Sequence, residues 1–181
     1  MKLTDKQMLD HWRESRGFVS AHSGCSMELF DYTDLKQRLN VEMRQWYLHL
    51  LDHGDLRYIV LHDVAERLKL TGGLGGIWHA RLPVDVRRLV SLTVSGAEVP
   101  VTVASAGSDV RRDTLNRNRF ARSGRHRPTA FVNDDGTLTL FCRDAVTKPV
   151  ILSAMAVVDP GDETYELDES ALKLLYDIPR L

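Results

Sequence analysis

The sequence predicts an α+β fold in which an N-terminal helix bundle is followed by a small antiparallel β domain and an extended or short-helical C-terminal arm. In the first third of the chain, apolar residues recur at intervals of three and four, which is typical of helices. From residue 82 to 160, alternating runs are separated by Pro, Gly and Asp turns, which is typical of short strands. Four glycines within residues 71–76 separate the two patterns. We therefore expect a helical part at 1–70, a β domain at 77–160 and an arm at 161–181.

The first helix is predicted to begin at a capping box, because Gln7 follows Thr4 by three residues. Its apolar face contains Met8, Leu9 and Trp12, and Arg16-Gly17 is expected to end it. Residues 18–30 are rich in small and polar residues and are expected to form a loop.

The second predicted helix begins near Thr33 and ends at Gly54, which suits a helix C-cap. Its apolar face is formed by Leu35, Leu39, Met43, Trp46 and Leu50. Residues 55–70 are ambiguous, since 58–61 favour a strand by composition and 64–68 favour a helix.

The β domain is expected to contain strands at 89–94, 99–103, 127–132, 137–141 and 149–158. The clearest turn is Asp135-Gly136, because Asp-Gly between two alternating runs is a strong hairpin signal. Between the second and third of these strands, residues 109–122 have a helix-like spacing with few apolar residues.

A segment rich in arginine interrupts the β domain at 109–127. It holds seven arginines against two aspartates, a local net charge of +5. Arginine makes paired hydrogen bonds to phosphate or carboxylate, so the segment suits either DNA or an acidic partner, and a solvated loop remains the alternative. The candidate residues are Arg111, Arg112, Arg117, Arg119, Arg122, Arg125 and Arg127.

The tail from Asp159 to Leu181 has the opposite charge, with seven acidic residues against two basic ones. Apolar residues alternate with these acids, so the tail could fold back on its own domain or become ordered on a partner. A short helix is expected at 169–176. The candidate partner-binding residues are Tyr165, Leu167, Leu172, Leu175, Tyr176, Ile178 and Leu181.

No motif predicts an active site, a cofactor or a metal centre. The glycine cluster at 71–76 lacks the Lys-Ser/Thr of a phosphate-binding loop, so we interpret it as a hinge or bulge. His49 and His53 stand one helical turn apart, but no Glu lies between them and no Cys or carboxylate clearly completes a site. We therefore interpret them as surface histidines near a helix C-terminus, which the helix dipole favours.

Composition adds further limits. The net charge of −1 predicts no general affinity for nucleic acid, so any contact with a polyanion must come from a local patch. Cys25 and Cys142 are far apart and are expected to be reduced thiols. No apolar stretch approaches membrane-spanning length, and we expect a soluble, intracellular protein when it is made.

The order of motifs in the β domain supports a family resemblance. Leu82-Pro83-Val84-Asp85 precedes the first strand, an arginine-bearing segment leads into 127–132, Asp135-Gly136 opens the next strand, and Asp159-Pro160 closes the last. In this order, the chain resembles the head-to-tail adaptor proteins of tailed bacteriophages, the connector or tail-tubular group that lies beneath the portal. The likeness covers most of the chain after residue 56.

The resemblance implies a structural virion protein without enzymatic activity. Such proteins form a ring, commonly of twelve copies, that binds the portal, receives tail proteins and contributes to the DNA channel. It further implies sequence-independent contacts between the arginine segment and double-stranded DNA or an acidic neighbour, and portal or tail contacts made by the arm. The protein would lie at the head–tail junction of the virion and in the host cytoplasm during assembly. The alternatives are a tail-side stopper or tail-completion protein and a small metal-binding or enzymatic domain.

Overall fold

The computed structural model of the chain describes residues 1–16, 32–105, 124, 126–142, 148–161 and 163–176. These residues form two compact units. We call residues 1–60 with 159–181 the terminal unit, because it combines both ends of the chain, and residues 61–158 the central unit.

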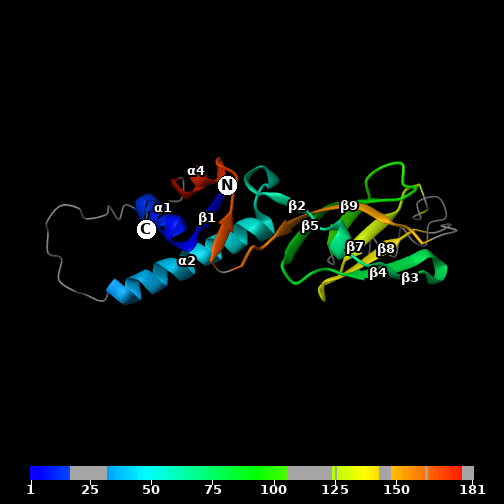
Figure 1. Ribbon diagram of the computed structural model, residues 1–181, viewed down its shortest axis with the longest axis horizontal. Helices are drawn as coiled ribbons and strands as arrows, with labels where there is room; N and C mark the ends of the chain where they lie inside the picture. Colours follow the sequence, from blue (N-terminus) through cyan, green and yellow to red (C-terminus); the bar gives the residue numbers. More distant parts are fainter. Residues whose placement is uncertain (17–31, 106–123, 125, 143–147, 162, 177–181) are drawn as a thin grey trace. The chain divides into compact units, whose positions relative to one another are not determined.

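The terminal unit is organised around a two-stranded antiparallel sheet made from the two ends of the chain. Strand β1 (Lys2–Thr4) pairs with β10 (Thr164–Glu166), so that Leu3 lies opposite Tyr165. Helices α1 (Asp5–Ser15), α2 (Tyr32–His53) and α4 (Ala171–Tyr176) complete the unit. Both α2 and α4 contact α1, and all three helices can be followed in Figure 1.

The start of α1 agrees with the sequence pattern. The Gln7 N–H donates to Thr4 Oγ1 at 3.4 Å and the Thr4 N–H donates to Gln7 Oε1 at 3.0 Å, so the predicted capping box is confirmed. The predicted apolar face is also buried, and Trp12 lies 5.8 Å from Trp46 of α2, centroid to centroid. Burial of this face holds α1 in the unit, since a helix of 11 residues is marginal alone.

Helix α2 has a broader buried face than the spacing predicted. Leu39, Met43 and Leu50 are buried as expected, and Tyr47 and Leu51 are buried with them. The Gly54 N–H donates to the Leu50 carbonyl at 2.7 Å and closes the last turn. After it, the chain forms a 3-10 turn (Leu56–Tyr58), and Ile59 then pairs with Leu167.

The central unit contains a three-stranded and a five-stranded sheet, in the orders β2-β9-β5 and β3-β4-β8-β7-β6. The strands of the first are β2 (Leu61–Asp63), β9 (Ile151–Val158) and β5 (Val86–Val94). Those of the second are β3 (Thr71–Gly72), β4 (Ile77–Arg81), β8 (Thr137–Phe141), β7 (Thr129–Val132) and β6 (Thr102–Ser105). Two 3-10 turns, Ala65–Arg67 and Leu74–Gly76, precede β3 and β4.

One apolar core joins the two sheets of the central unit. Leu89, Leu92 and Ala156 of the smaller sheet are buried with Ala130 and Leu140 of the larger one. The sheets also meet through a backbone hydrogen bond, in which the Val101 N–H donates to the Leu92 carbonyl at 2.6 Å. In the larger sheet, which can be followed in Figure 1, β8 lies between β4 and β7.

The predicted α+β fold, with an N-terminal helix bundle followed by an antiparallel β domain and an arm, is wrong. Three sheets make the described chain rich in strands, and the helices do not form an N-terminal bundle. The first residues instead pair with 164–166, and 55–70 form short turns and β2 rather than a helix. The β part is also not wholly antiparallel, because β6 and β7 pair in parallel. These errors share a cause, since pairing between distant segments leaves no local periodicity.

Several local expectations are confirmed within the central unit. The strands expected at 89–94, 127–132, 137–141 and 149–158 correspond to β5, β7, β8 and β9. Asn133–Gly136 form the turn of the β7–β8 hairpin, with the Gly136 N–H donating to the Asn133 carbonyl at 3.0 Å. In the part of the chain that the structure describes, no helix is long and apolar enough to cross a membrane.

Candidate functional site

The candidate arginines are only partly placed. Arg111, Arg112, Arg117, Arg119, Arg122 and Arg125 lie outside the described residues. Arg127 is described and exposed, two residues before β7. Its neighbour His126 lies 3.2 Å from the Glu98 carboxylate, and the His126 carbonyl accepts a hydrogen bond from the Glu98 N–H. These contacts fix the backbone beside Arg127 at the surface of the central unit.

The candidate partner-binding residues of the tail fall into two groups. Tyr165, Leu167 and Leu175 are buried in the terminal unit, whereas Leu172 is half-buried. Tyr176 is 51 % exposed at the end of α4, where its hydroxyl donates to Glu14 of α1 at 3.2 Å. Ile178 and Leu181 lie outside the described residues. Among the candidate tail residues that the structure describes, a partner can therefore reach Tyr176, and part of Leu172, on α4 without opening the unit.

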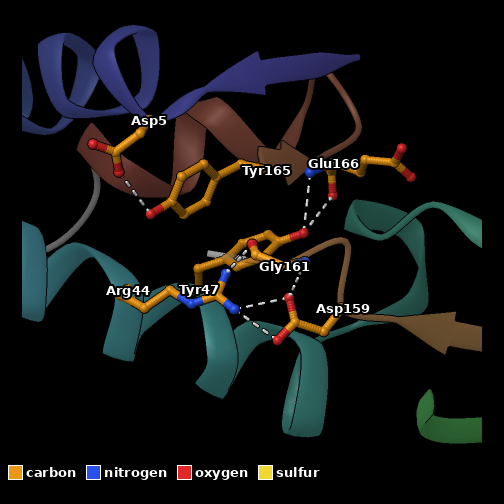
Figure 2. A network of polar contacts seen from close by, with 7 residues as sticks. All are labelled: Asp5, Arg44, Tyr47, Asp159, Gly161, Tyr165 and Glu166. Carbon is orange, nitrogen blue, oxygen red and sulfur yellow. Dashed lines mark hydrogen bonds and ion pairs between the residues drawn. The ribbon is translucent and has the colours of Figure 1, made fainter. Parts of the chain in front are cut away.

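The buried part of the tail is held by a polar network that sequence reasoning missed (Figure 2). Arg44 of α2 donates from Nη2 to both carboxylate oxygens of Asp159, at 2.9 and 2.7 Å, and from Nη1 to the Gly161 carbonyl at 3.0 Å. The Gly161 N–H donates in turn to Asp159 Oδ1 at 3.1 Å. Both side chains of the ion pair are less than one-fifth exposed, so water screens it weakly.

Two tyrosines extend this network. The Glu166 N–H donates to Tyr47 Oη at 3.0 Å, and the Tyr47 hydroxyl donates in turn to the Glu166 carbonyl at 3.4 Å. The Tyr165 hydroxyl donates to Asp5 at 3.2 Å, and its ring meets the Tyr47 ring edge-on at 4.9 Å. The Glu166 side chain, 8 % exposed, is paired with Lys2 at 2.6 Å.

The electrostatics of the two tyrosines indicate a structural role. Burial raises the pKa of Tyr47 to about 12, and burial with the nearby Asp5 carboxylate raises the pKa of Tyr165 to about 12. Both phenols therefore keep their protons at neutral pH and act as hydrogen-bond donors. The network ties β10 to α1 and α2 and shows no activated nucleophile.

The motifs considered for metal or phosphate binding have clear places in the fold. The glycine cluster forms the β3–β4 hairpin, where a Cβ on Gly73 would lie 2.6 Å from the Trp78 ring, and Gly73 itself has a φ of +117°. Glycine is thus needed for packing at that position. His49 and His53 have ring centroids 5.0 Å apart on α2. Among the residues described here, no group of three or more His, Cys, Asp or Glu side chains could hold a metal ion.

Comparison with known proteins adds no assignment. No protein-family model matches the chain, and no curated protein matches it.

The sequence gives one sign of the polar network around Arg44. Asp159-Pro160-Gly161 predicts a turn, but this pattern does not reveal that Arg44 binds the turn.

Proposed function

We propose that this chain is a structural virion protein, a head-to-tail adaptor that forms a ring beneath a bacteriophage portal, joins the capsid to the tail and contributes to the DNA channel. The observation that carries the proposal is the order of the adaptor-like motifs along the sequence, from Leu82-Pro83-Val84-Asp85 to Asp159-Pro160. A protein in this role needs surfaces for neighbouring copies, for the portal and for the tail, and no catalytic centre.

The motifs coincide with tight, well-anchored turns. Asp85 accepts a hydrogen bond from Arg67 Nη1 at 2.8 Å, and the Val86 N–H donates to the Pro83 carbonyl at 3.0 Å directly before β5. Asp135 Oδ1 accepts from the Thr137 N–H at 2.8 Å in the β7–β8 turn. Because these motif residues shape the fold, their order supports a shared architecture more than a shared binding site.

The arginine segment supports a role for the central unit at the DNA channel. Its local charge of +5 would attract a polyanion such as DNA. Contacts to the phosphates, without contacts to the bases, would allow the DNA to slide. Arg127 is the exposed, described member of this set. Tail residues on α4, with Tyr176 foremost, are the proposed contacts to the portal or a tail protein.

Reconstitution with a portal tests the proposal. The purified chain is mixed with the portal ring from the same genome and examined by analytical ultracentrifugation and negative-stain microscopy. A stoichiometric extra ring on the portal is expected. A folded chain that stays monomeric beside the portal would contradict the adaptor role, and binding to tail proteins alone would favour a tail-side stopper.

A matched pair of variants then tests the contact on α4. Tyr176→Ala should weaken portal binding, because aromatic side chains contribute strongly to protein interfaces. Val41→Ala removes an apolar side chain of α2 that is 55 % exposed and should leave binding unchanged. Equal binding by both variants would exclude Tyr176 from the interface.

A further inference from the structure

The last two turns of α2 carry a pair of exposed histidines that the proposed function does not use. His49 and His53 are four residues apart, so their side chains leave the helix on the same face. Their ring centroids lie 5.0 Å apart and their planes are inclined by 55°. The two imidazoles are therefore neighbours at the surface and point into solvent.

The backbone beneath this pair is held in place from the opposite side of the helix. Tyr47, Leu50 and Leu51, which lie in the same turns, are buried in the terminal unit. Tyr47 is further fixed by its hydrogen bonds to Glu166, and the Gly54 N–H closes the final turn on Leu50. A ligand that binds both imidazoles would thus order only two side chains and no backbone, which keeps the entropic cost of binding low.

We propose that His49 and His53 form a two-ligand chelate site for a divalent transition-metal ion of the class that prefers imidazole, such as Cu²⁺, Ni²⁺ or Zn²⁺. Two histidines one helical turn apart are the ligand arrangement found on the helix of many zinc sites. Imidazole nitrogen suits these ions, and Cu²⁺ forms the most stable complexes among them. A carboxylate-seeking ion such as Mg²⁺ or Ca²⁺ would not bind the pair.

The site differs from a complete structural metal centre. Within the described part of the chain, no third His, Cys, Asp or Glu joins the pair to form a possible metal-binding group. Water would fill the remaining coordination positions, so the ion is exchangeable and the fold does not depend on it. This inference does not rest on the adaptor function, because it uses only the geometry of α2.

Copper binding to the full chain tests the inference. Cu²⁺ is titrated into the metal-free protein by calorimetry, and the bound ion is examined by electron paramagnetic resonance. We expect one ion per chain at the tightest site and coupling to two imidazole nitrogens. A spectrum with one imidazole nitrogen, or one tight ion per two chains, would overturn the two-ligand site.

Three variants locate the ion. His49→Ala and His53→Ala should each weaken Cu²⁺ binding by about tenfold or more, a loss of roughly 1.4 kcal/mol, because either change leaves a single imidazole. Alanine favours helices, so α2 should persist, as circular dichroism can confirm. His126→Ala, which removes a lone imidazole 68 % exposed on the central unit, is the control and should leave the tight site unchanged. Wild-type affinity in both α2 variants would place the ion elsewhere and overturn the proposal.

Discussion

The terminal and central units are stabilised in different ways. The central unit is one continuous stretch of chain with an aliphatic core shared by its two sheets. The terminal unit joins residues more than 150 positions apart and holds them with buried aromatic rings and the Arg44–Asp159 ion pair. The comparison indicates that 61–158 contains the contacts its core needs, whereas residues 1–60 depend on 159–176.

Removal of residues 159–181 should have the largest effect, because it should unfold the terminal unit and leave the central unit folded. The deletion takes away β10, α4 and the large buried apolar side chains of Tyr165, Leu167 and Leu175. Since a single buried Leu→Ala change costs about 2–5 kcal/mol, the sum should exceed the stability of a small unit. Hydrogen exchange should show residues 1–60 losing protection while the central unit keeps it. Retained protection in α1 and α2 would show that these helices fold without the tail.

Arg44→Met should be the most damaging single change in the network. It leaves the Asp159 carboxylate partly buried without its cation, at a cost of about 2–3 kcal/mol, somewhat below that of a fully buried pair. Arg57→Met is the control, since Arg57 pairs with Asp55 but is 79 % exposed and should matter little. Urea unfolding of both variants measures the difference, and equal midpoints would contradict a structural role for Arg44.

Tyr47→Phe should destabilise the terminal unit by about 1–3 kcal/mol, because the buried N–H of Glu166 loses its acceptor. The change should also alter the response to alkali. The raised pKa of Tyr47 means that its contribution is complete below about pH 10 and is lost as pH rises toward about 12. Tyrosinate absorbance of the native chain should lose one late-titrating component in Tyr47→Phe, and an unchanged alkaline titration would contradict this account.

Asp63→Asn should cause the smallest loss of stability among these variants. The loss should affect the central unit and be greatest near neutral pH. Asp63 accepts hydrogen bonds from the N–H groups of Ala154 and Ala65, at 3.0 and 2.9 Å, and from the Ser153 hydroxyl, and these bonds lower its pKa. Its contribution is therefore present above the ordinary carboxyl pKa and is lost as pH falls through the lower folded value.

The variant should consequently be less stable than the wild type at pH 7, and the difference in stability should shrink at pH 2–3. Urea midpoints at the two pH values measure this, with Glu66→Gln, an exposed carboxylate of the same unit, as the control. A difference in urea midpoint that stays constant with pH would show that the hydrogen bonds of Asp63 do not cause the loss of stability in acid.

The local signals of the sequence predicted local structure well. The Thr4–Gln7 capping box, the Asp135-Gly136 turn and the alternation in 137–141 each depend on residues within a few positions of one another. Their physical causes are complete within one segment, so a pattern can reveal them.

Long-range pairing could not be predicted in the same way. Lys2–Thr4 is too short to show alternation, and its partner β10 lies within an acidic tail that fits either an arm or a strand. The β4 strand follows glycines that suggested a hinge, and Arg44 falls among polar residues of α2 without a sign of its partner Asp159. For the candidate site, the sequence identified Tyr176 and Arg127 but not which tail residues the fold buries.

The most direct test of the account is whether the two ends of the chain form a folding unit without the middle. Leu61 and Val157 lie opposite each other in the β2–β9 pair, so a short Gly/Ser linker can replace residues 61–158. Thermal unfolding of this shortened chain, followed by circular dichroism and tryptophan fluorescence, is compared with that of residues 1–60 alone. The account predicts a cooperative transition for the joined ends and none for residues 1–60. A cooperative transition in residues 1–60 alone would contradict it.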